Sequence, residues 1–313
     1  MSNKFLSAAI LVTISNLFLQ SGCNAQSAKT NSNVQEQIYN IKTQKIYSPT
    51  IGNPKKISNG VLVYEIKLKN ENQTNNVWIY LPQKPAKAKI PCVLIAPAGS
   101  HLIDGSSLGE GSSAEHIPYV KAGFAVIAYD IDGEAEDDSE ASLIKAAKAF
   151  KNSNAGLINE ENALDYALAK FPVVDSEQIY IAGHSSAATH ALLVAANEPR
   201  IKGAIAYAPA TDIEKFIGAG LDAFDDYISG FHKFISQSSP INNISKIKVP
   251  VFLFHSEADS TVSIKMTEDF SEKLNQSNAN VTFVKAKSGD HYSSMIKEGI
   301  PKGIEWLNKQ IAK

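Results

Sequence analysis

The sequence predicts an α/β fold with an eight-stranded, mostly parallel sheet, helices on both faces and a short helical lid. Two observations support this fold class. Apolar, β-prone runs alternate with helix-period segments through most of the chain, which is typical of a sheet built from strand-helix-strand units. The 313 residues are 44% hydrophobic and 20% charged, enough apolar material for one large core in a single domain.

The predicted strands and helices follow one another in a regular order. The first two strands, over residues 61–68 and 76–81, flank a polar turn and predict an antiparallel hairpin. Six more strands are expected over residues 92–96, 124–129, 178–182, 203–207, 251–255 and 281–286. Helices are expected over residues 114–121, 141–150, 160–170, 188–197, 264–274 and 302–311. This alternation implies right-handed crossovers and parallel later strands.

Ser185 is the candidate nucleophile. It lies in the pentapeptide Gly183-His184-Ser185-Ser186-Ala187, directly after a predicted strand and directly before a predicted helix. A serine on such a sharp strand-to-helix turn is held out of the backbone above the sheet, where its hydroxyl can attack a substrate.

Two further residues complete a candidate catalytic triad. Asp259 lies in the polar turn after the strand over residues 251–255, and His291 is the first histidine after the last predicted strand. An imidazole near its ordinary pKa of about 6.5 is a suitable base for a serine hydroxyl, and a carboxylate orients that imidazole. By strand count, Ser185, Asp259 and His291 follow the fifth, seventh and eighth strands.

These motifs carry a family resemblance. The pentapeptide around Ser185, the segment 248–262 and Gly289-Asp290-His291 resemble the α/β-hydrolase superfamily, in its dienelactone-hydrolase and prolyl-oligopeptidase branch. The resemblance covers roughly residue 61 to the end. It implies the α/β-hydrolase fold and a triad in the order Ser, Asp, His. Two positions depart from the family: Ala187 and Ser256 each stand where a glycine is usual.

An oxyanion hole is expected beside Ser185. The backbone N–H of Ser186 should supply one donor, and the loop after the third strand, with Ala98, Gly99 and Ser100, should supply the other. The choice among those three residues stays open.

Other residues compete for these roles. Asp212 follows the sixth predicted strand, a position that some superfamily members use for the acid, and Asp290 is adjacent to His291 in sequence. His255 is expected to brace the acid turn, and His101 is a candidate for lining the site. No two histidines show metal-ligand spacing on one helix face, so we expect no metal site. A mechanism through an acyl-serine intermediate is expected to use no organic cofactor either.

The segment between the sixth and seventh predicted strands is expected to set substrate choice. Eight apolar residues recur there at helical spacing between Phe216 and Phe234. We interpret the segment as a helix that packs on the core and forms a short lid over Ser185. Its aromatic side chains suggest a substrate with an apolar acyl or aryl group.

Residues 1–25 predict a signal peptide. Lys4 precedes an apolar run over residues 5–19, about 15 residues, which is too short for a comfortable membrane span. Ser21-Gly22-Cys23 resembles a bacterial lipobox, which implies a membrane tether through a lipidated Cys23, although Gln20 departs from that pattern and ordinary cleavage near Ala25 stays open. Residues 26–57 predict an irregular lead-in or tether, and residues 58–313 the catalytic domain.

The sequence therefore predicts an exported serine hydrolase, in the bacterial cell envelope or secreted, that cleaves a small carboxylic ester through an acyl-serine intermediate. The same triad also suits a small peptidase or amidase, or an esterase acting on acylated carbohydrates. A non-catalytic ligand-binding protein on the same fold stays open. The net charge of −2, without a basic cluster, argues against nucleic acid as a partner.

Overall fold

The computed structural model describes residues 51–57, 60–69, 74–109, 113–277 and 280–312. The predicted signal peptide, Cys23 and most of the predicted lead-in lie outside these residues. None of the helices in the described part of the chain has both the length and the apolar character of a membrane span.

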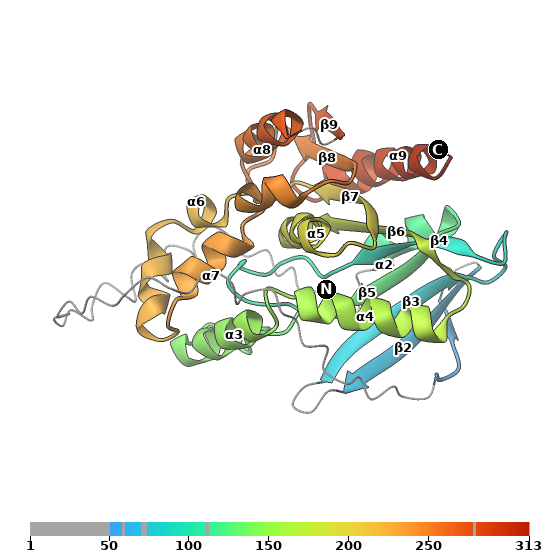
Figure 1. Ribbon diagram of the computed structural model, residues 1–313, viewed down its shortest axis with the longest axis horizontal. Helices are drawn as coiled ribbons and strands as arrows, with labels where there is room; N and C mark the ends of the chain where they lie inside the picture. The colour runs from blue at the N-terminus through green and yellow to red at the C-terminus, as the bar shows by residue number, and fades with distance from the viewer. Residues whose placement is uncertain (1–50, 58–59, 70–73, 110–112, 278–279, 313) are drawn as a thin grey trace.

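A single mixed sheet forms the centre of the molecule (Figure 1). Its strands are β1 Lys55–Lys56, β2 Val61–Lys69, β3 Thr74–Pro82, β4 Ile90–Ile95, β5 Ala125–Tyr129, β6 Val174–His184, β7 Ile201–Tyr207, β8 Val251–Ser256 and β9 Val281–Ala286. Their spatial order is β1-β2-β3-β5-β4-β6-β7-β8-β9, antiparallel from β1 to β5 and parallel from β5 to β9.

The predicted α/β-hydrolase architecture is confirmed, with all eight expected strands present. The structure adds β1, a two-residue edge strand paired with β2. Two residues are too few to produce a period-2 pattern, so sequence periodicity cannot detect such a strand. Because of β1, the strands that precede Ser185, Asp259 and His291 are numbered β6, β8 and β9.

Helices cover both faces of the sheet (Figure 1). They are α2 Ser113–Lys121, α3 Glu140–Asn152, α4 Leu157–Lys170, α5 Ser186–Asn197, α8 Ile264–Gln276 and α9 Ile300–Ile311. Helices α2 and α9 pack on one face; α3, α4, α5 and α8 pack on the other. Along β5 the side chains alternate between the two cores, with Ile127 and Tyr129 on the α5 side and Val126 and Ala128 on the α2 side.

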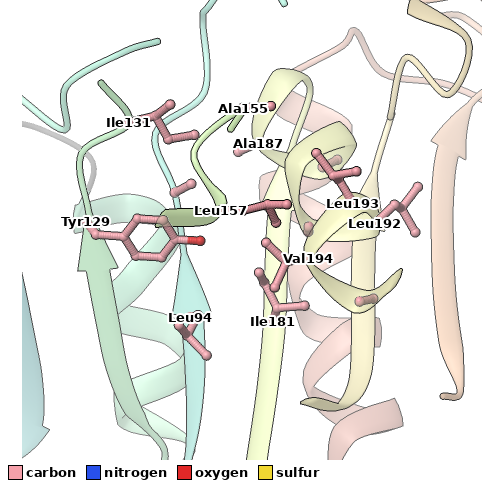
Figure 2. Close-up of a cluster of buried hydrophobic side chains, with 14 of the residues drawn as sticks. Leu94, Tyr129, Ile131, Ala155, Leu157, Ile181, Ala187, Leu192, Leu193 and Val194 are labelled. Carbon is pink, nitrogen blue, oxygen red and sulfur yellow. The ribbon is translucent and has the colours of Figure 1, made fainter. Parts of the chain in front are cut away.

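The larger core lies between the sheet and α5. Figure 2 shows Val194 of α5 next to Ile181 of β6; Leu192 and Leu193 of the same helix and Leu94 of β4 belong to the same core. These two strands also form the switch point of the sheet, because the chain leaves β4 toward β5 on one side and returns with β6 on the other. Ligands of open α/β sheets bind at the carboxyl ends of strands at such a switch point.

The predicted lid helix is divided into several short elements. The segment between β7 and β8 contains α6 Ile213–Ile217, a 3₁₀ helix over Gly218–Asp226, α7 Phe231–Ser238 and a second 3₁₀ helix over Pro240–Lys246. Gly218 and Gly230 have φ values of 73° and 67°, which end the regular helical path. The helical period of the apolar residues does not detect these breaks.

Candidate active site

Ser185 lies on a strained turn between β6 and α5. Its φ of 57° and ψ of −121° are rare for a residue with a side chain, and its N–H donates to the carbonyl of Tyr207 at 2.9 Å. Gly183 allows the close approach of strand and helix, because a Cβ there would lie 2.2 Å from the carbonyl oxygen of Ala187. The half-buried Ser185 therefore has the geometry of a nucleophile elbow.

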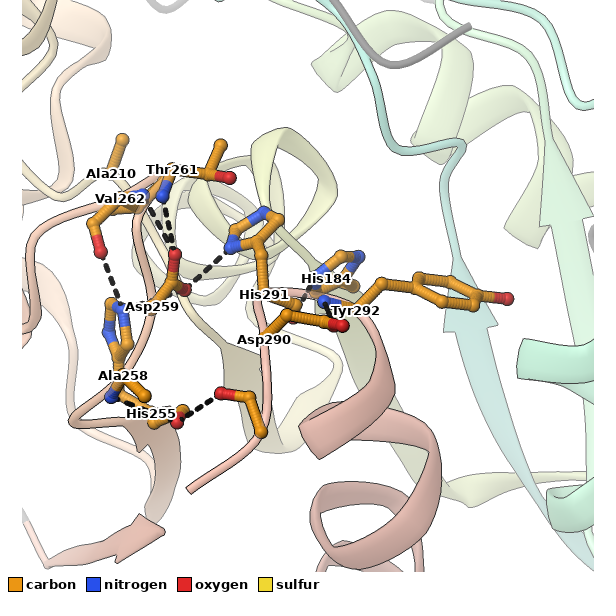
Figure 3. Close-up of polar contacts among 12 residues, drawn as sticks. His184, Ala210, His255, Ala258, Asp259, Thr261, Val262, Asp290, His291 and Tyr292 are labelled. Carbon is orange, nitrogen blue, oxygen red and sulfur yellow. Dashed lines mark hydrogen bonds and ion pairs between the residues drawn. The ribbon is translucent and has the colours of Figure 1, made fainter. Parts of the chain in front are cut away.

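Asp259 and His291 form a close pair (Figure 3). His291 Nδ1 lies 2.6 Å from Asp259 Oδ2, and the Asp259 side chain is only 1% exposed. The other carboxylate oxygen, Oδ1, accepts the backbone N–H groups of Thr261 and Val262 at 2.8 and 3.0 Å. The acid turn therefore holds the carboxylate with its Oδ2 toward the imidazole.

A second histidine contacts the same carboxylate. His255 is fully buried, and its Nε2 lies 3.1 Å from Asp259 Oδ2 and 2.9 Å from the carbonyl of Val262. Since both neighbours are acceptors, Nε2 carries the proton, while Nδ1 accepts from the Thr267 hydroxyl at 2.8 Å. Burial by itself raises the pKa of Asp259, but the hydrogen bonds from His255 and His291 outweigh it and hold this pKa well below its usual value.

The loop after β9 fixes the position of His291. The Ser256 hydroxyl donates to the carbonyl of Gly289 at 2.6 Å, so Ser256, the departure from the family's glycine, joins the acid turn to the histidine loop. His184 Nε2 donates to the carbonyl of His291 at 3.0 Å, and the centroids of the two rings are 4.5 Å apart. Because His184 directly precedes Ser185, these contacts place His291 next to the elbow.

The free nitrogen of His291 has no partner in the structure. Its Nε2 is shielded from solvent and makes no hydrogen bond with any described residue, Ser185 included. The structure thus joins Asp259 to His291 directly, and brings Ser185 to the same site without a direct hydrogen bond. Catalytic hydrogen bonds are often longer in an unliganded enzyme and tighten when substrate binds.

The two rival acids are engaged elsewhere. Asp212 caps α6 by accepting the backbone N–H of Lys215 at 3.1 Å. Asp290 accepts the N–H groups of Tyr292 and Ser293 at 3.0 and 2.6 Å. Among the described residues, the carboxylate that contacts the His291 ring is that of Asp259.

The predicted oxyanion loop approaches the elbow through an arrangement that sequence reasoning missed. The backbone N–H groups of Gly99 and Ser100 both donate to the side-chain hydroxyl of Ser186, at 3.0 and 3.1 Å. The backbone N–H of Ser186 lies in the first turn of α5, where it has no acceptor within the helix. Three backbone donors are thus gathered around one residue, but two of them already have an acceptor.

The same loop contains a second imidazole-carboxylate pair. His101 Nδ1 lies 2.7 Å from Asp104 Oδ2, and this hydrogen bond raises the pKa of His101 above its usual value although burial opposes the shift. His101 is not part of the pocket wall, whereas its neighbours Ser100 and Leu102 are.

An apolar pocket opens beside Ser186. Its wall includes Pro97, Ser100 and Leu102 of the β4 loop, Phe150 of α3, Leu193 of α5, and Ile213 and Ser238 of the lid segment. The lid aromatics Phe224, Phe231 and Phe234 are not in this wall. They are buried against one another and against Phe150, and they form an aromatic core within the lid segment.

Metal-binding residues are not clustered in the described part of the chain, where no group of three or more His, Cys, Asp or Glu side chains is placed to hold an ion.

Comparison with known proteins identifies a family and solved structures that are similar to this chain. The model of the prolyl oligopeptidase family, Peptidase_S9, matches residues 112–313. That range contains Ser185, Asp259 and His291. No curated protein matches the chain.

Solved structures share the fold at low sequence identity. An acylaminoacyl peptidase from Pyrococcus horikoshii matches with a TM-score of 0.66 and 16% identity over 82% of this chain and 42% of its own. A Klebsiella pneumoniae protein named as a dienelactone hydrolase matches with a TM-score of 0.59 and 17% sequence identity, over 80% of this chain and 100% of its own. Acetyl xylan esterase 1 from Thermoanaerobacterium matches with a TM-score of 0.60 and 14% sequence identity, over 85% of this chain and 88% of its own. The present chain thus spans less than half the length of the acylaminoacyl peptidase.

Proposed function

Because this chain belongs to the prolyl oligopeptidase family and is a serine hydrolase, we propose that it cleaves carboxylic esters through an acyl intermediate on Ser185. The observation that carries the proposal is the buried Asp259–His291 pair, set next to a serine on a strained elbow. This arrangement supplies a nucleophile, a base and a group that orients the base.

The first half of the reaction forms the acyl-enzyme. Ser185 Oγ attacks the ester carbonyl carbon while His291 Nε2 takes the hydroxyl proton, and the carbonyl π electrons move onto oxygen. The tetrahedral intermediate then collapses, the bond to the leaving alkoxide breaks, and the proton passes from His291 to that alkoxide. Asp259 stabilises the imidazolium that exists between the two transfers.

Water completes the reaction along the same path. His291 Nε2 takes a proton from water, the resulting oxygen attacks the acyl carbon, and the proton returns to Ser185 Oγ as the carboxylic acid leaves. The state of Asp259 suits this role, since its low pKa keeps the carboxylate ionised throughout the neutral range.

The pocket beside Ser186 supports a short, uncharged acyl group. Among the described residues that form its wall there is no Asp, Glu, Lys or Arg. The titratable His190 in the wall has its pKa lowered to about 4 by burial, so it is neutral at pH 7. A charged substrate group buried here would lack a counter-ion and would pay a desolvation penalty.

Amide hydrolysis is a second candidate function, which the family assignment favours. The same residues cleave an amide when His291 protonates a leaving amine instead of an alkoxide. An uncharged pocket suits an N-acylated substrate better than a free amino terminus, because a free terminus is a cation.

The proposed function is tested by replacing the nucleophile in the full chain. Ser185→Ala should abolish hydrolysis of p-nitrophenyl butyrate and labelling by a fluorophosphonate, because both need the Ser185 hydroxyl. Ser271→Ala in α8 serves as the matched control and should keep both. Parallel assays with the p-nitroanilide of butyric acid separate esterase from amidase activity. Residual esterase activity in Ser185→Ala above about a thousandth of the original would contradict the proposal, since loss of a triad member leaves little catalysis.

We also propose that the protein is exported, from the pattern of residues 1–25. Expression in a bacterial host and mass spectrometry of the mature chain test this. The expected N-terminus is a lipid-modified Cys23, or an unmodified residue near position 25. A chain that keeps Met1 would contradict export by this signal.

A further inference from the structure

We propose that the side-chain hydroxyl of Ser186 is itself a donor to the oxyanion, acting with the backbone N–H of the same residue. The loop amides of Gly99 and Ser100 then do not contact the oxyanion themselves; they hold and polarise the Ser186 hydroxyl. This inference rests on the proposed acyl-transfer function and assigns the oxyanion donor within it.

Hydrogen-bond accounting at Ser186 leads to this assignment. A serine hydroxyl has two acceptor positions and one proton to donate. The N–H groups of Gly99 and Ser100 fill both acceptor positions, at 3.0 and 3.1 Å. The remaining proton has no acceptor among the residues that the structure describes, although Ser186 is only 8% exposed. It is therefore a buried donor available to an oxygen that arrives with the substrate.

The hydroxyl is in the right place because it belongs to the residue after the nucleophile. The backbone N–H of this residue is the usual first oxyanion donor at a nucleophile elbow. In its gauche rotamers a serine has its backbone nitrogen and its Oγ roughly 3 Å apart. Ser186 and Ser100 both line the pocket. One residue thus carries two donors directly next to the nucleophile.

The loop that holds the hydroxyl is itself fixed. The Ser100 hydroxyl accepts the N–H of Leu102 at 3.2 Å, and Leu102 has a φ of 68°. His101 donates its backbone N–H to Asp104 at 2.6 Å and pairs with it through Nδ1. These bonds keep the Gly99 and Ser100 amides directed at Ser186 Oγ. Two donors on one oxygen increase the polarity of its own O–H bond.

The role in the reaction follows from the charge balance. When Ser185 Oγ bonds to the carbonyl carbon, the carbonyl π pair becomes a localised negative charge on oxygen. The Ser186 N–H and O–H hydrogen-bond to that oxygen without transferring their protons, and the charge returns to the C=O bond on collapse. Donors directed at this charge stabilise the transition state more than the neutral ester, so they act on kcat.

Substitution of Ser186 separates this assignment from direct donation by the loop. In Ser186→Ala the Gly99 and Ser100 amides lose their acceptor and become free. If they were the true oxyanion donors, kcat would stay within about threefold of the original. If the hydroxyl is the donor, kcat should fall about 10²- to 10³-fold with KM nearly unchanged. Ser186→Thr keeps the hydroxyl and should recover most of the lost kcat.

A transition-state analogue gives a second readout in the same variant. An alkyl boronic acid forms a tetrahedral adduct with Ser185, and its Kd should weaken in Ser186→Ala by about the same factor as kcat. The melting temperature should stay close to that of the unchanged protein. Unchanged boronate affinity, or a rise in KM with no fall in kcat, would overturn the assignment. Fluorophosphonate labelling of Ser185 in the unchanged chain tests the proposed function separately. Failure of the proposed function can therefore be told apart from failure of the oxyanion assignment.

Discussion

At the scale of single residues, Asp259 is the most constrained group of the site. It receives hydrogen bonds from two backbone N–H groups and contacts two imidazoles, His255 and His291. His255 is fully buried and makes its other hydrogen bonds with Val262 and Thr267, so its role is to position the carboxylate. The carboxylate keeps Oδ2 directed at Nδ1 of His291, which fixes the tautomer that leaves Nε2 free to accept a proton.

Replacement of Asp259 tests this assignment against its rival. Asp259→Asn should lower kcat about 10⁴-fold, because the amide favours the wrong tautomer of the histidine. Asp212→Asn is the matched control: asparagine also caps a helix, so activity should stay within about threefold. Steady-state kinetics on p-nitrophenyl butyrate measure both. A larger loss from Asp212→Asn than from Asp259→Asn would reverse the assignment of the acid.

At the scale of elements, the junction of β6 and α5 determines the geometry of the site. The turn keeps Ser185 at a positive φ, a conformation that costs about 1–3 kcal/mol for a residue with a side chain. Packing of α5 on β6 and β7 maintains the turn, since the helix is buried along nearly its whole length. The strand and the helix approach so closely that Gly183 has no room for a side chain.

Adding a methyl group at Gly183 tests this close approach. In Gly183→Ala the new Cβ would meet backbone atoms of Ala187 at 2.2 Å, so α5 must shift and carry Ser185 with it. We expect a loss of about 1–3 kcal/mol in the free energy of unfolding, or more, together with a large fall in kcat.

Gly203→Ala provides the comparison, because its Cβ would meet the side chains of Trp306 and Tyr180 at 3.1 and 3.2 Å, where small adjustments suffice. It should be better tolerated in both chemical denaturation and activity assays. Equal effects of the two substitutions would argue against a special constraint at the elbow.

At the scale of the whole molecule, buried histidines make stability depend on pH. Burial is the main cause that lowers the pKa of His116 and His184 to about 3, and that of His190 to about 4. In the unfolded chain each pKa returns to about 6.5. Between these values the unfolded state binds protons that the folded state excludes. Stability is therefore present above about pH 6.5 and is lost as the pH falls toward 4 and below.

The expected result is a steep fall in melting temperature between about pH 6 and pH 4. Each buried histidine contributes a slope of up to about 1.4 kcal/mol per pH unit in this range. His116→Phe should reduce the slope by roughly that amount, because it keeps a ring against Tyr80 and removes the titrating group.

His232 provides a control for this measurement. Its side chain is 37% exposed, and its hydrogen bonds to Glu214 and Asp222 raise its pKa above the usual value. A histidine with a raised pKa in the folded state does not lose stability as the pH falls. His232→Asn should leave the acid slope unchanged. If His116→Phe leaves the dependence of stability on pH unchanged, the loss of stability at acid pH has another origin.

Sequence patterns alone predicted the fold class, the order of the strands along the chain and the candidate triad, with Asp259 as the acid and Asp212 as its rival. These depend on local signals: apolar periodicity identifies the strands and helices, and short motifs at strand ends identify Ser185, Asp259 and His291. Sequence patterns missed β1 and the breaks in the lid, because a two-residue strand has no period and a glycine's φ does not appear in a hydrophobic pattern.

The tertiary structure decided which groups pair with which. Asp259 was the predicted acid and Asp212 its rival, and the contact between β8 and β9 brings Asp259 to His291. The lid aromatics pack on one another instead of lining the pocket, and the loop after β4 directs two amides at Ser186 Oγ. Such pairings join residues as many as 87 positions apart, so they depend on how packing brings separate elements together and leave no signal in any local stretch of sequence.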